Sequence, residues 1–215
     1  MDQPKALKAR RDLPGGYRLR RDIDLSSDLQ LLLALNLAGL ALLLAALVGF
    51  GQLAQAAHPG FRAAGLLGGQ LAPGLTGALA QVGLYLLAFG LTLALHELVH
   101  GLFFWLFTGE RPVFGLKLSY AYAAAPDWYL PRSRYLIVGL APLVALTALG
   151  LALLPGLPDE LLGAWLLAMI TSTSGAVGDL YVVGYLLTCP PASLVRDRGD
   201  GMAIYIPGSA AEAAE

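Results

Sequence analysis

One five-residue stretch holds two of the three histidines in this sequence, with a glutamate between them. It is His96-Glu97-Leu98-Val99-His100, which has the pattern H-E-x-x-H. On a helix of 3.6 residues per turn, side chains four positions apart share a face, so both imidazoles can converge on one metal ion. Glu97 lies between them and can take a proton from a water molecule at that ion. The stretch therefore predicts a metal centre that performs hydrolysis.

The composition places this stretch in a membrane protein. Of the 215 residues, 57% are hydrophobic, 26 are glycine and 13% are charged, and the mean hydropathy is +0.65. Average soluble domains contain about 45–50% apolar residues with glycine included. A net charge of −1 excludes a basic nucleic-acid-binding protein, and a single cysteine, Cys189, excludes an intramolecular disulfide framework.

Four segments are long and apolar enough to cross a bilayer, whose core of about 30 Å needs roughly 20 apolar residues in a helix. These segments are 29–50, 80–107, 135–154 and 161–188. The first and third contain no charged residue, the second carries only Glu97 and the fourth only Asp179. The predicted fold class is an all-α membrane protein with four transmembrane helices.

The basic residues predict the orientation of these helices. Four spans with both termini in the cytoplasm place all Lys and Arg residues inside except Arg62, as the positive-inside rule requires. The alternative interpretation of the first segment is a cleaved signal peptide. Because 28 residues precede it and its uncharged stretch exceeds the usual 7–15 residues, we favour a membrane span.

Asp179 is the candidate third metal ligand. Catalytic zinc takes three protein ligands and leaves one position for water. The continuation H-E-x-x-H-x-x-G-x-x-H fails here, because Phe103 and Leu106 occupy its glycine and third histidine positions. Counted from the cytoplasmic ends of their helices, His96, His100 and Asp179 lie roughly 10–17 Å inside the bilayer at 1.5 Å per residue. The three groups therefore share one level.

Electrostatics also favours a filled metal site. An acidic residue at the centre of a membrane helix costs about 2.5–3.5 kcal/mol. A Zn²⁺ ion against the carboxylates of Asp179 and Glu97 is formally neutral, whereas two unpaired buried carboxylates would have to bind protons. The cofactor that we expect is Zn²⁺.

The loop after the second segment shows a strand-like pattern. Phe114, Leu116, Leu118, Tyr120 and Tyr122 alternate with smaller or polar residues, the period of two that is typical of a strand. We expect a short cytoplasmic β-like hairpin after the second helix. This hairpin has two alternative roles. Its free edge could hold an unwound substrate in extended form, or the hairpin could only cap the helices.

Other residues within the segments have simpler interpretations. Pro142 in the third segment is expected to bend its helix. His58 belongs to the outer loop, remote from the other two histidines. We expect neither residue to take part in the chemistry.

The motifs resemble two groups of known proteins. The H-E-x-x-H stretch, with an aspartate in a later segment, resembles the site-2 protease class of intramembrane zinc metalloproteases. A closer resemblance is to small bacterial membrane proteins described as putative zincin peptidases, and it is carried by His100-Gly101, the Pro142 segment, Gly178-Asp179 and Asp197-Arg198-Gly199 with Tyr205. Site-2 proteases usually have Leu-Asp-Gly at the third ligand, where this chain has Gly178-Asp179-Leu180.

The resemblance implies that His96, His100 and Asp179 bind zinc and that Glu97 is the catalytic carboxylate. The expected function is a zinc-dependent endopeptidase that hydrolyses peptide bonds within or beside the bilayer. Its partners are the lipid bilayer and a membrane-anchored or peptide substrate, with no nucleic acid. The alternative is a non-catalytic protein, either a zinc-stabilised membrane scaffold or a metal carrier.

These expectations give a simple domain organisation. Residues 1–28 form a cytoplasmic basic arm, residues 29–188 form the four-helix transmembrane metallopeptidase domain, and residues 189–215 form a cytoplasmic tail. The expected location is a bacterial cytoplasmic membrane, which the chain crosses several times.

Overall fold

The computed structural model describes residues 8–24, 28–61, 74–116, 121–199 and 201–208. The chain divides into two compact units. We call the first the sheet unit; it comprises Met1–Ala34, Glu97–Ala141 and Asp179–Glu215. The second, the helical unit, comprises Leu35–His96 and Pro142–Gly178. The boundaries fall inside long helices, so that both units draw on the same helices.

The structure confirms four long apolar helical stretches at the predicted segments. In chain order they are α1 (Leu29–Ala57), α2 (Gly74–Thr108), α3 (Arg132–Leu153) with the short 3₁₀ helix η2 (Leu154–Gly156), and then η3 (Asp159–Leu161), α4 (Leu162–Gly175) and α5 (Val177–Leu187). Within the described residues, four helical stretches are long and apolar enough to cross a membrane: Leu29–Ala57, Gly74–Thr108, Arg132–Gly156 and Asp159–Leu187.

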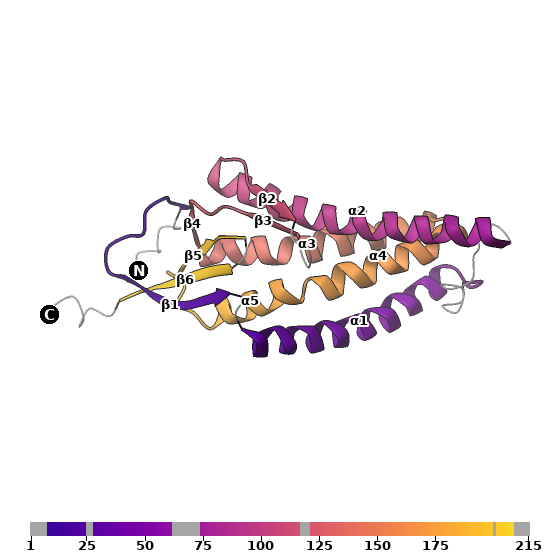
Figure 1. Cartoon of the computed structure of the whole chain (residues 1–215), viewed down its shortest axis with the longest axis horizontal. Coiled ribbons are helices and arrows are strands. Elements are labelled where there is room, and N and C mark those ends of the chain that lie inside the picture. Colours follow the sequence, from indigo (N-terminus) through magenta and orange to yellow (C-terminus); the bar gives the residue numbers. More distant parts are fainter. Residues whose placement is uncertain (1–7, 25–27, 62–73, 117–120, 200, 209–215) are drawn as a thin grey trace. The chain divides into compact units, whose positions relative to one another are not determined.

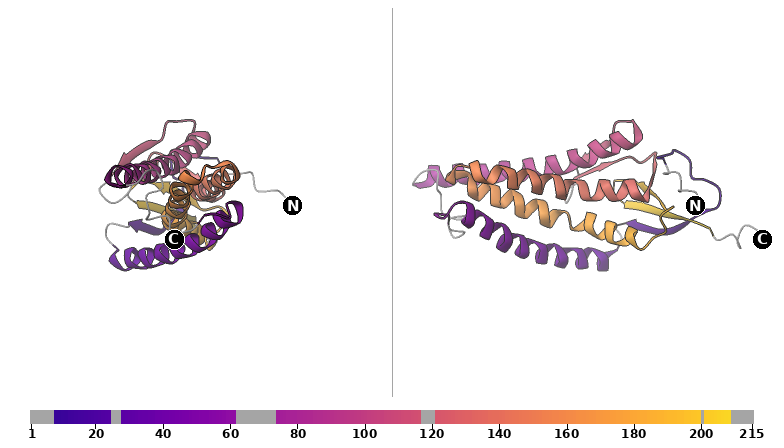
Figure 2. Two further views of the ribbon diagram at one scale, coloured as in Figure 1. Left: turned by 90° about the vertical axis from the view of Figure 1, so that its right-hand side faces the viewer. Right: turned by 180° about the vertical axis from the view of Figure 1, so that it is seen from behind.

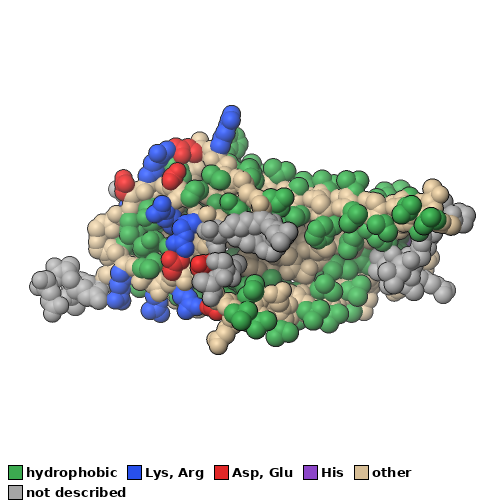
Figure 3. All heavy atoms as spheres, viewed as in Figure 1, with side chains coloured by type: hydrophobic (Ala, Val, Ile, Leu, Met, Phe, Trp, Pro, Cys, Tyr) green, Lys and Arg blue, Asp and Glu red, His purple; other side chains and the backbone are tan. Residues whose placement is uncertain are grey.

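The surface of these helices is apolar. Leu37 on α1 and Leu75 on α2 are 69% and 76% exposed, and many other leucines on both helices are also exposed. On the face drawn in Figure 3, charged side chains gather around the strands and the neighbouring helix ends, whereas hydrophobic side chains cover the helices. Large exposed apolar patches mark membrane or partner contacts, and here their extent suits lipid. The side that faces the cytoplasm stays a prediction.

The fourth predicted span is not one continuous helix. The pattern predicts a helix over 161–188, but α4 ends at Gly175 and α5 begins at Val177. The Thr171 hydroxyl donates to the carbonyls of Leu167 and Ala168, at 2.8 and 3.1 Å. Such hydroxyl bonds to the preceding turn bend helices, and glycine lowers helix propensity. The run of hydroxyls and glycine therefore accounts for the break.

An antiparallel sheet, which we do not predict from the sequence, joins the two ends of the chain. Its strands are β1 (Tyr17–Asp24), β4 (Tyr129–Pro131), β5 (Leu194–Asp197) and β6 (Gly201–Pro207), in the order β1-β6-β5-β4 (Figure 1). Tyr17 pairs with Pro207 and Leu194 with Tyr205. Most of β1 is exposed and basic, so its residues resemble a charged arm. The predicted all-α class is therefore corrected to helices with small sheets.

The predicted hairpin is confirmed in the described residues. Strand β2 (Val113–Leu116) pairs antiparallel with β3 (Ala121–Ala124), and Val113 lies opposite Ala124. The residues 117–120, which belong to the predicted strand pattern, lie outside the described residues. The two alternative roles of the hairpin, substrate binding and capping of the helices, stay predictions.

Each unit has its own hydrophobic core. In the sheet unit, side chains from helices and strands meet around Phe104, Val138, Leu186, Val195 and Ile204. These residues bring the ends of α2, α3 and α5 onto strands β5 and β6, which fixes the helix segments that carry the site.

In the helical unit, Trp165 of α4 donates its indole N–H to the Gly150 carbonyl of α3 at 2.8 Å. The two helices lie side by side in both views of Figure 2. A side chain at Gly150 would meet Met169, so that this glycine permits the close approach.

Candidate metal centre

Helix α2 presents both motif histidines on its buried face. His96 and His100 are each 8% exposed, whereas Leu98 and Leu102 on the same helix are 54% and 47% exposed. This arrangement follows from the helical period, because residues 96 and 100 are one turn apart and residues 98 and 102 lie on another face. The predicted shared face of the two histidines is therefore present.

Asp179 lies in the first turn of α5. One of its carboxylate oxygens, Oδ2, is 3.4 Å from Nε2 of His100, and the two side chains are 25% and 10% exposed. Both residues belong to the sheet unit. The N-terminal turn of a helix favours a negative charge, because the peptide dipoles align there. The break before α5 therefore places Asp179 where its carboxylate is electrostatically supported.

The three predicted ligands form one group. Each of His96, His100 and Asp179 offers a ligand atom, and these atoms all lie within 4.8 Å of one another. Within the described part of the chain, this is the one group of three or more His, Cys, Asp or Glu residues close enough to hold a metal ion. Two imidazole nitrogens and one carboxylate oxygen are a donor set that zinc accepts, at bond lengths of about 2.0–2.2 Å. The residues therefore fit the expected Zn²⁺.

The second ring nitrogen of His100 has a partner on α3. Nδ1 lies 3.0 Å from the Val138 carbonyl oxygen, and the bond is buried. A carbonyl only accepts, so Nδ1 carries a hydrogen, and in the neutral ring this leaves the lone pair of Nε2 for a metal ion. Metal-binding histidines commonly have such a partner, which sets the tautomer and the ring orientation.

A glycine on α3 permits close packing beside Asp179. A Cβ atom at Gly139 would lie 2.9 Å from Cγ2 of Val183 and 3.9 Å from the Asp179 carbonyl oxygen. Real Cβ atoms do not come so near a neighbouring carbon, so α3 approaches α5 closely only because residue 139 has no side chain. Sequence reasoning missed Gly139, although a small residue near a proline within a membrane span is a recognisable signal.

The hairpin packs against α2 next to the second histidine. A Cβ atom at Gly101 would lie 2.9 Å from Cε1 of Phe114 and 3.2 Å from Cγ of Pro112. Glycine at position 101 therefore lets β2 lie directly against the turn that carries His100. The hairpin is close enough to the site for either of its two predicted roles.

A tyrosine and an aspartate add a polar pair near this site. The Tyr135 hydroxyl donates to Oδ2 of Asp197 at 2.5 Å, and the Gly199 backbone N–H donates to Oδ1 at 2.8 Å. Burial raises the pKa of Asp197 above its ordinary value of 3.8, while these two hydrogen bonds oppose the rise. The negative charge of Asp179 also raises this pKa. Sequence reasoning singled out Asp197 only through the family resemblance.

We expect the thermal stability of Asp197→Asn, relative to that of the native protein, to increase as the pH rises. Because the pKa is raised by folding, the folded state holds the proton more tightly than the unfolded state. Stability is therefore lost as the pH rises from about 4 through the raised pKa, with a limiting slope of about 1.4 kcal/mol for each pH unit. Asparagine has no carboxyl group to titrate, so Asp197→Asn does not lose stability in this way as the pH rises.

Melting temperatures in detergent, measured between about pH 4 and pH 8, test this expectation. Asp127→Asn is the matched control, because Asp127 is exposed on a loop. A stability difference between Asp197→Asn and the native protein that stays constant over this range would contradict the prediction.

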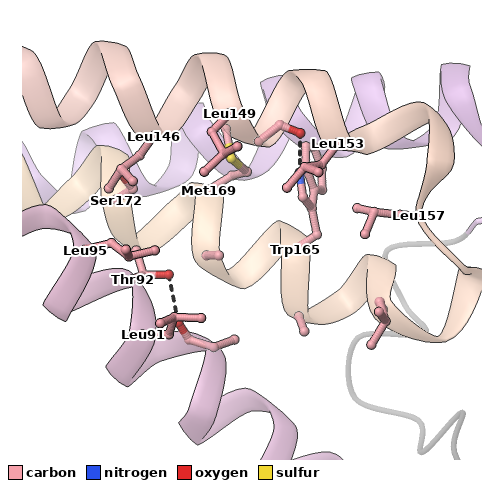
Figure 4. A pocket seen from close by; sticks show the side chains of 15 residues that line it. Leu91, Thr92, Leu95, Leu146, Leu149, Leu153, Leu157, Trp165, Met169 and Ser172 are labelled. Carbon is pink, nitrogen blue, oxygen red and sulfur yellow. Dashed lines mark hydrogen bonds between the residues drawn. The ribbon is translucent and has the colours of Figure 1, made fainter.

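An apolar pocket occupies the helical unit (Figure 4). Its volume is about 260 Å³. It is lined by parts of α2, α3 and α4, among them Leu91, Thr92, Leu95, Leu146, Leu149 and Met169. Ser172 also lines it, and its buried hydroxyl has no hydrogen-bond partner among the described residues. Thr92 and Leu95 occupy the turn of α2 just before His96, which is not itself a lining residue.

Comparison with known families adds one finding. A family model described as "Putative zincin peptidase" matches residues 89–194. The matched stretch contains His96, Glu97, His100 and Asp179. No curated protein and no solved structure matches the chain.

Proposed function

Residues 89–194 match the family model described as "Putative zincin peptidase", and from this premise we propose that the chain is a zinc-dependent endopeptidase of the membrane. It hydrolyses peptide bonds within or beside the bilayer, in the manner of site-2 proteases. The observation that carries the proposal is the buried group of His96, His100 and Asp179, with ligand atoms within 4.8 Å of one another. Glu97 follows the first of these ligands directly.

The three ligand side chains and Glu97 have different roles in hydrolysis. His96, His100 and Asp179 would hold Zn²⁺ and leave a position for water and substrate. When bound, the ion lowers the pKa of water toward about 7 and polarises the scissile carbonyl. Glu97 takes a proton from the attacking water as the new C–O bond forms, and it passes that proton to the leaving amine as the C–N bond breaks. The carboxylate thus ends the cycle unchanged.

The apolar surroundings support a substrate that comes from the lipid. The pocket of the helical unit, which is lined in part by the turn of α2 before His96, is formed almost entirely by apolar side chains. Its volume of about 260 Å³ exceeds the roughly 150 Å³ that holds a benzene molecule, so it has room for a large apolar side chain. The unpartnered Ser172 hydroxyl offers a hydrogen bond to the backbone of an unwound segment. We propose that the substrate is an apolar, membrane-anchored peptide segment.

The two alternative functions, a metal carrier and a zinc-stabilised scaffold, require different residues. A metal carrier needs further ligands along a path across the membrane, but the described residues contain a single group of three possible ligands. A zinc-stabilised scaffold needs the ligands but has no use for Glu97. The position of Glu97 within the motif therefore favours an enzyme.

Removal of the metal tests the proposal directly. We expect purified protein in detergent to contain about one zinc per chain, the number that one three-ligand site holds, and to cleave a single-span test peptide. Chelation should abolish cleavage, and added zinc should restore it. His96→Ala should lose both zinc and cleavage.

His58→Ala is a matched control, since His58 instead contacts Asp159 at 3.0 Å and the Leu154 carbonyl at 2.9 Å. Full cleavage by zinc-free protein would refute the proposal.

A further inference from the structure

A proline within α3 stands four residues after the carbonyl that contacts the metal ligand His100. Pro142 lies inside the helix Arg132–Leu153, and its side chain is fully buried. In a regular α-helix the N–H of residue 142 would donate to the carbonyl of Val138. Proline has no N–H, so this carbonyl has no such donor from its own helix.

The Val138 carbonyl, which lacks a helical donor because of Pro142, is the carbonyl that His100 contacts. Its oxygen lies 3.0 Å from Nδ1 of His100, in a buried contact. Val138 itself is 1% exposed, so water cannot readily replace a missing donor. A buried carbonyl without a donor is costly, and the imidazole N–H supplies the donor that the helix lacks.

We propose that Pro142 is a positioning residue for the metal centre. By withholding its own hydrogen bond from the Val138 carbonyl, it reserves that oxygen for Nδ1–H of His100. The imidazole is thereby held with its Nδ1–H on the Val138 carbonyl and its Nε2 facing Asp179 at 3.4 Å, which is the ring orientation that a metal ion at Nε2 requires. The inference goes beyond the bend expected of a proline, and its functional meaning rests on the proposed zinc site.

Replacement of the proline separates this role from a structural one. Pro142→Ala restores an N–H that competes with His100 for the Val138 carbonyl. We expect the dissociation constant for zinc to rise about 10- to 100-fold, the usual effect of losing a ligand's hydrogen-bond partner. The melting temperature of the zinc-free variant should rise or stay the same, because a proline that weakens its own helix has been removed.

A spectroscopic readout does not depend on zinc or on cleavage. Imidazole ¹⁵N NMR of the zinc-free native protein should show His100 protonated on Nδ1. In Pro142→Ala, part of that population should move to Nε2, because Nδ1 has lost its exclusive acceptor. Pro142→Gly also restores the N–H and provides a second variant if alanine does not fit the buried site.

Pro155→Ala is the matched control, since Pro155 occupies the first turn of η2, where no helical N–H is required. We expect this control to keep the native zinc affinity and His100 tautomer. An unchanged zinc affinity and unchanged tautomer in both Pro142 variants would overturn the inference. Absence of zinc or of cleavage in the native protein would instead refute the proposed function, so that the two failures are distinguishable.

Discussion

Glu97→Gln should reduce kcat/KM for peptide cleavage by about 10²–10⁴-fold, the range for loss of a general acid–base group, while zinc remains bound. Glutamine has nearly the same shape as glutamate, but its amide cannot accept and return the proton of the attacking water. His96, His100 and Asp179 are unchanged in this variant, so the proposed ligand set is complete. The measurement pairs zinc content with initial cleavage rates of a single-span peptide in the same preparation.

The control for this variant is Glu160→Gln, since Glu160 is exposed and lies outside the site. It should retain both zinc and full activity. If Glu97→Gln cleaved at the native rate, Glu97 would not be the proton carrier, and a zinc-stabilised scaffold with a contaminating protease would become the better explanation. If Glu97→Gln lost zinc as well, Glu97 would instead contribute to binding the metal.

The histidine pair was predictable because it depends only on local geometry. His96 and His100 are four residues apart in a segment that is unmistakably helical, so their shared face follows from the helical period. Asp179 required one further step, in which its depth in another span was compared with theirs. Both inferences use the way in which membrane thickness and helix rise restrict where a residue can lie, and the three side chains do form one group.

The contacts that support the site were much less predictable. The Val138 carbonyl belongs to the backbone, and no residue type reveals which carbonyl lacks a helical donor unless the proline four residues later is considered. The pairing of β1 with β6 joins residues that are far apart in the chain, such as Tyr17 and Pro207. Such non-local pairing leaves little trace in local patterns, especially in a strand as exposed and basic as β1.

The break between α4 and α5 lies in a run of residues whose types have two different effects on helices. The hydroxyl and glycine residues from Thr171 to Gly175 suggest close packing of helices. The same residues also weaken a helix, since the Thr171 hydroxyl bonds back to the Leu167 carbonyl. The second effect places Asp179 in a first turn rather than in mid-helix, where its charge is better stabilised.

The other large effect is expected at Asp179. Asp179→Ala should weaken zinc binding by at least about 100-fold, beyond the 10- to 100-fold that loss of an outer hydrogen-bond partner costs. Two buried imidazoles then remain without the carboxylate that offsets part of the charge of the ion, and charge is costly in surroundings from which water is excluded. Cleavage should fall with zinc occupancy.

Competition with a chromophoric chelator measures this loss as a dissociation constant, and Asp127→Ala on the exposed loop should match the native protein. Asp179→Asn provides a second comparison, because the amide keeps the shape of the side chain but lacks the negative charge. If charge decides the affinity, Asp179→Asn should bind zinc nearly as weakly as Asp179→Ala. Native affinity in Asp179→Ala would show that another residue supplies the third ligand, and the site would have to be rebuilt around it.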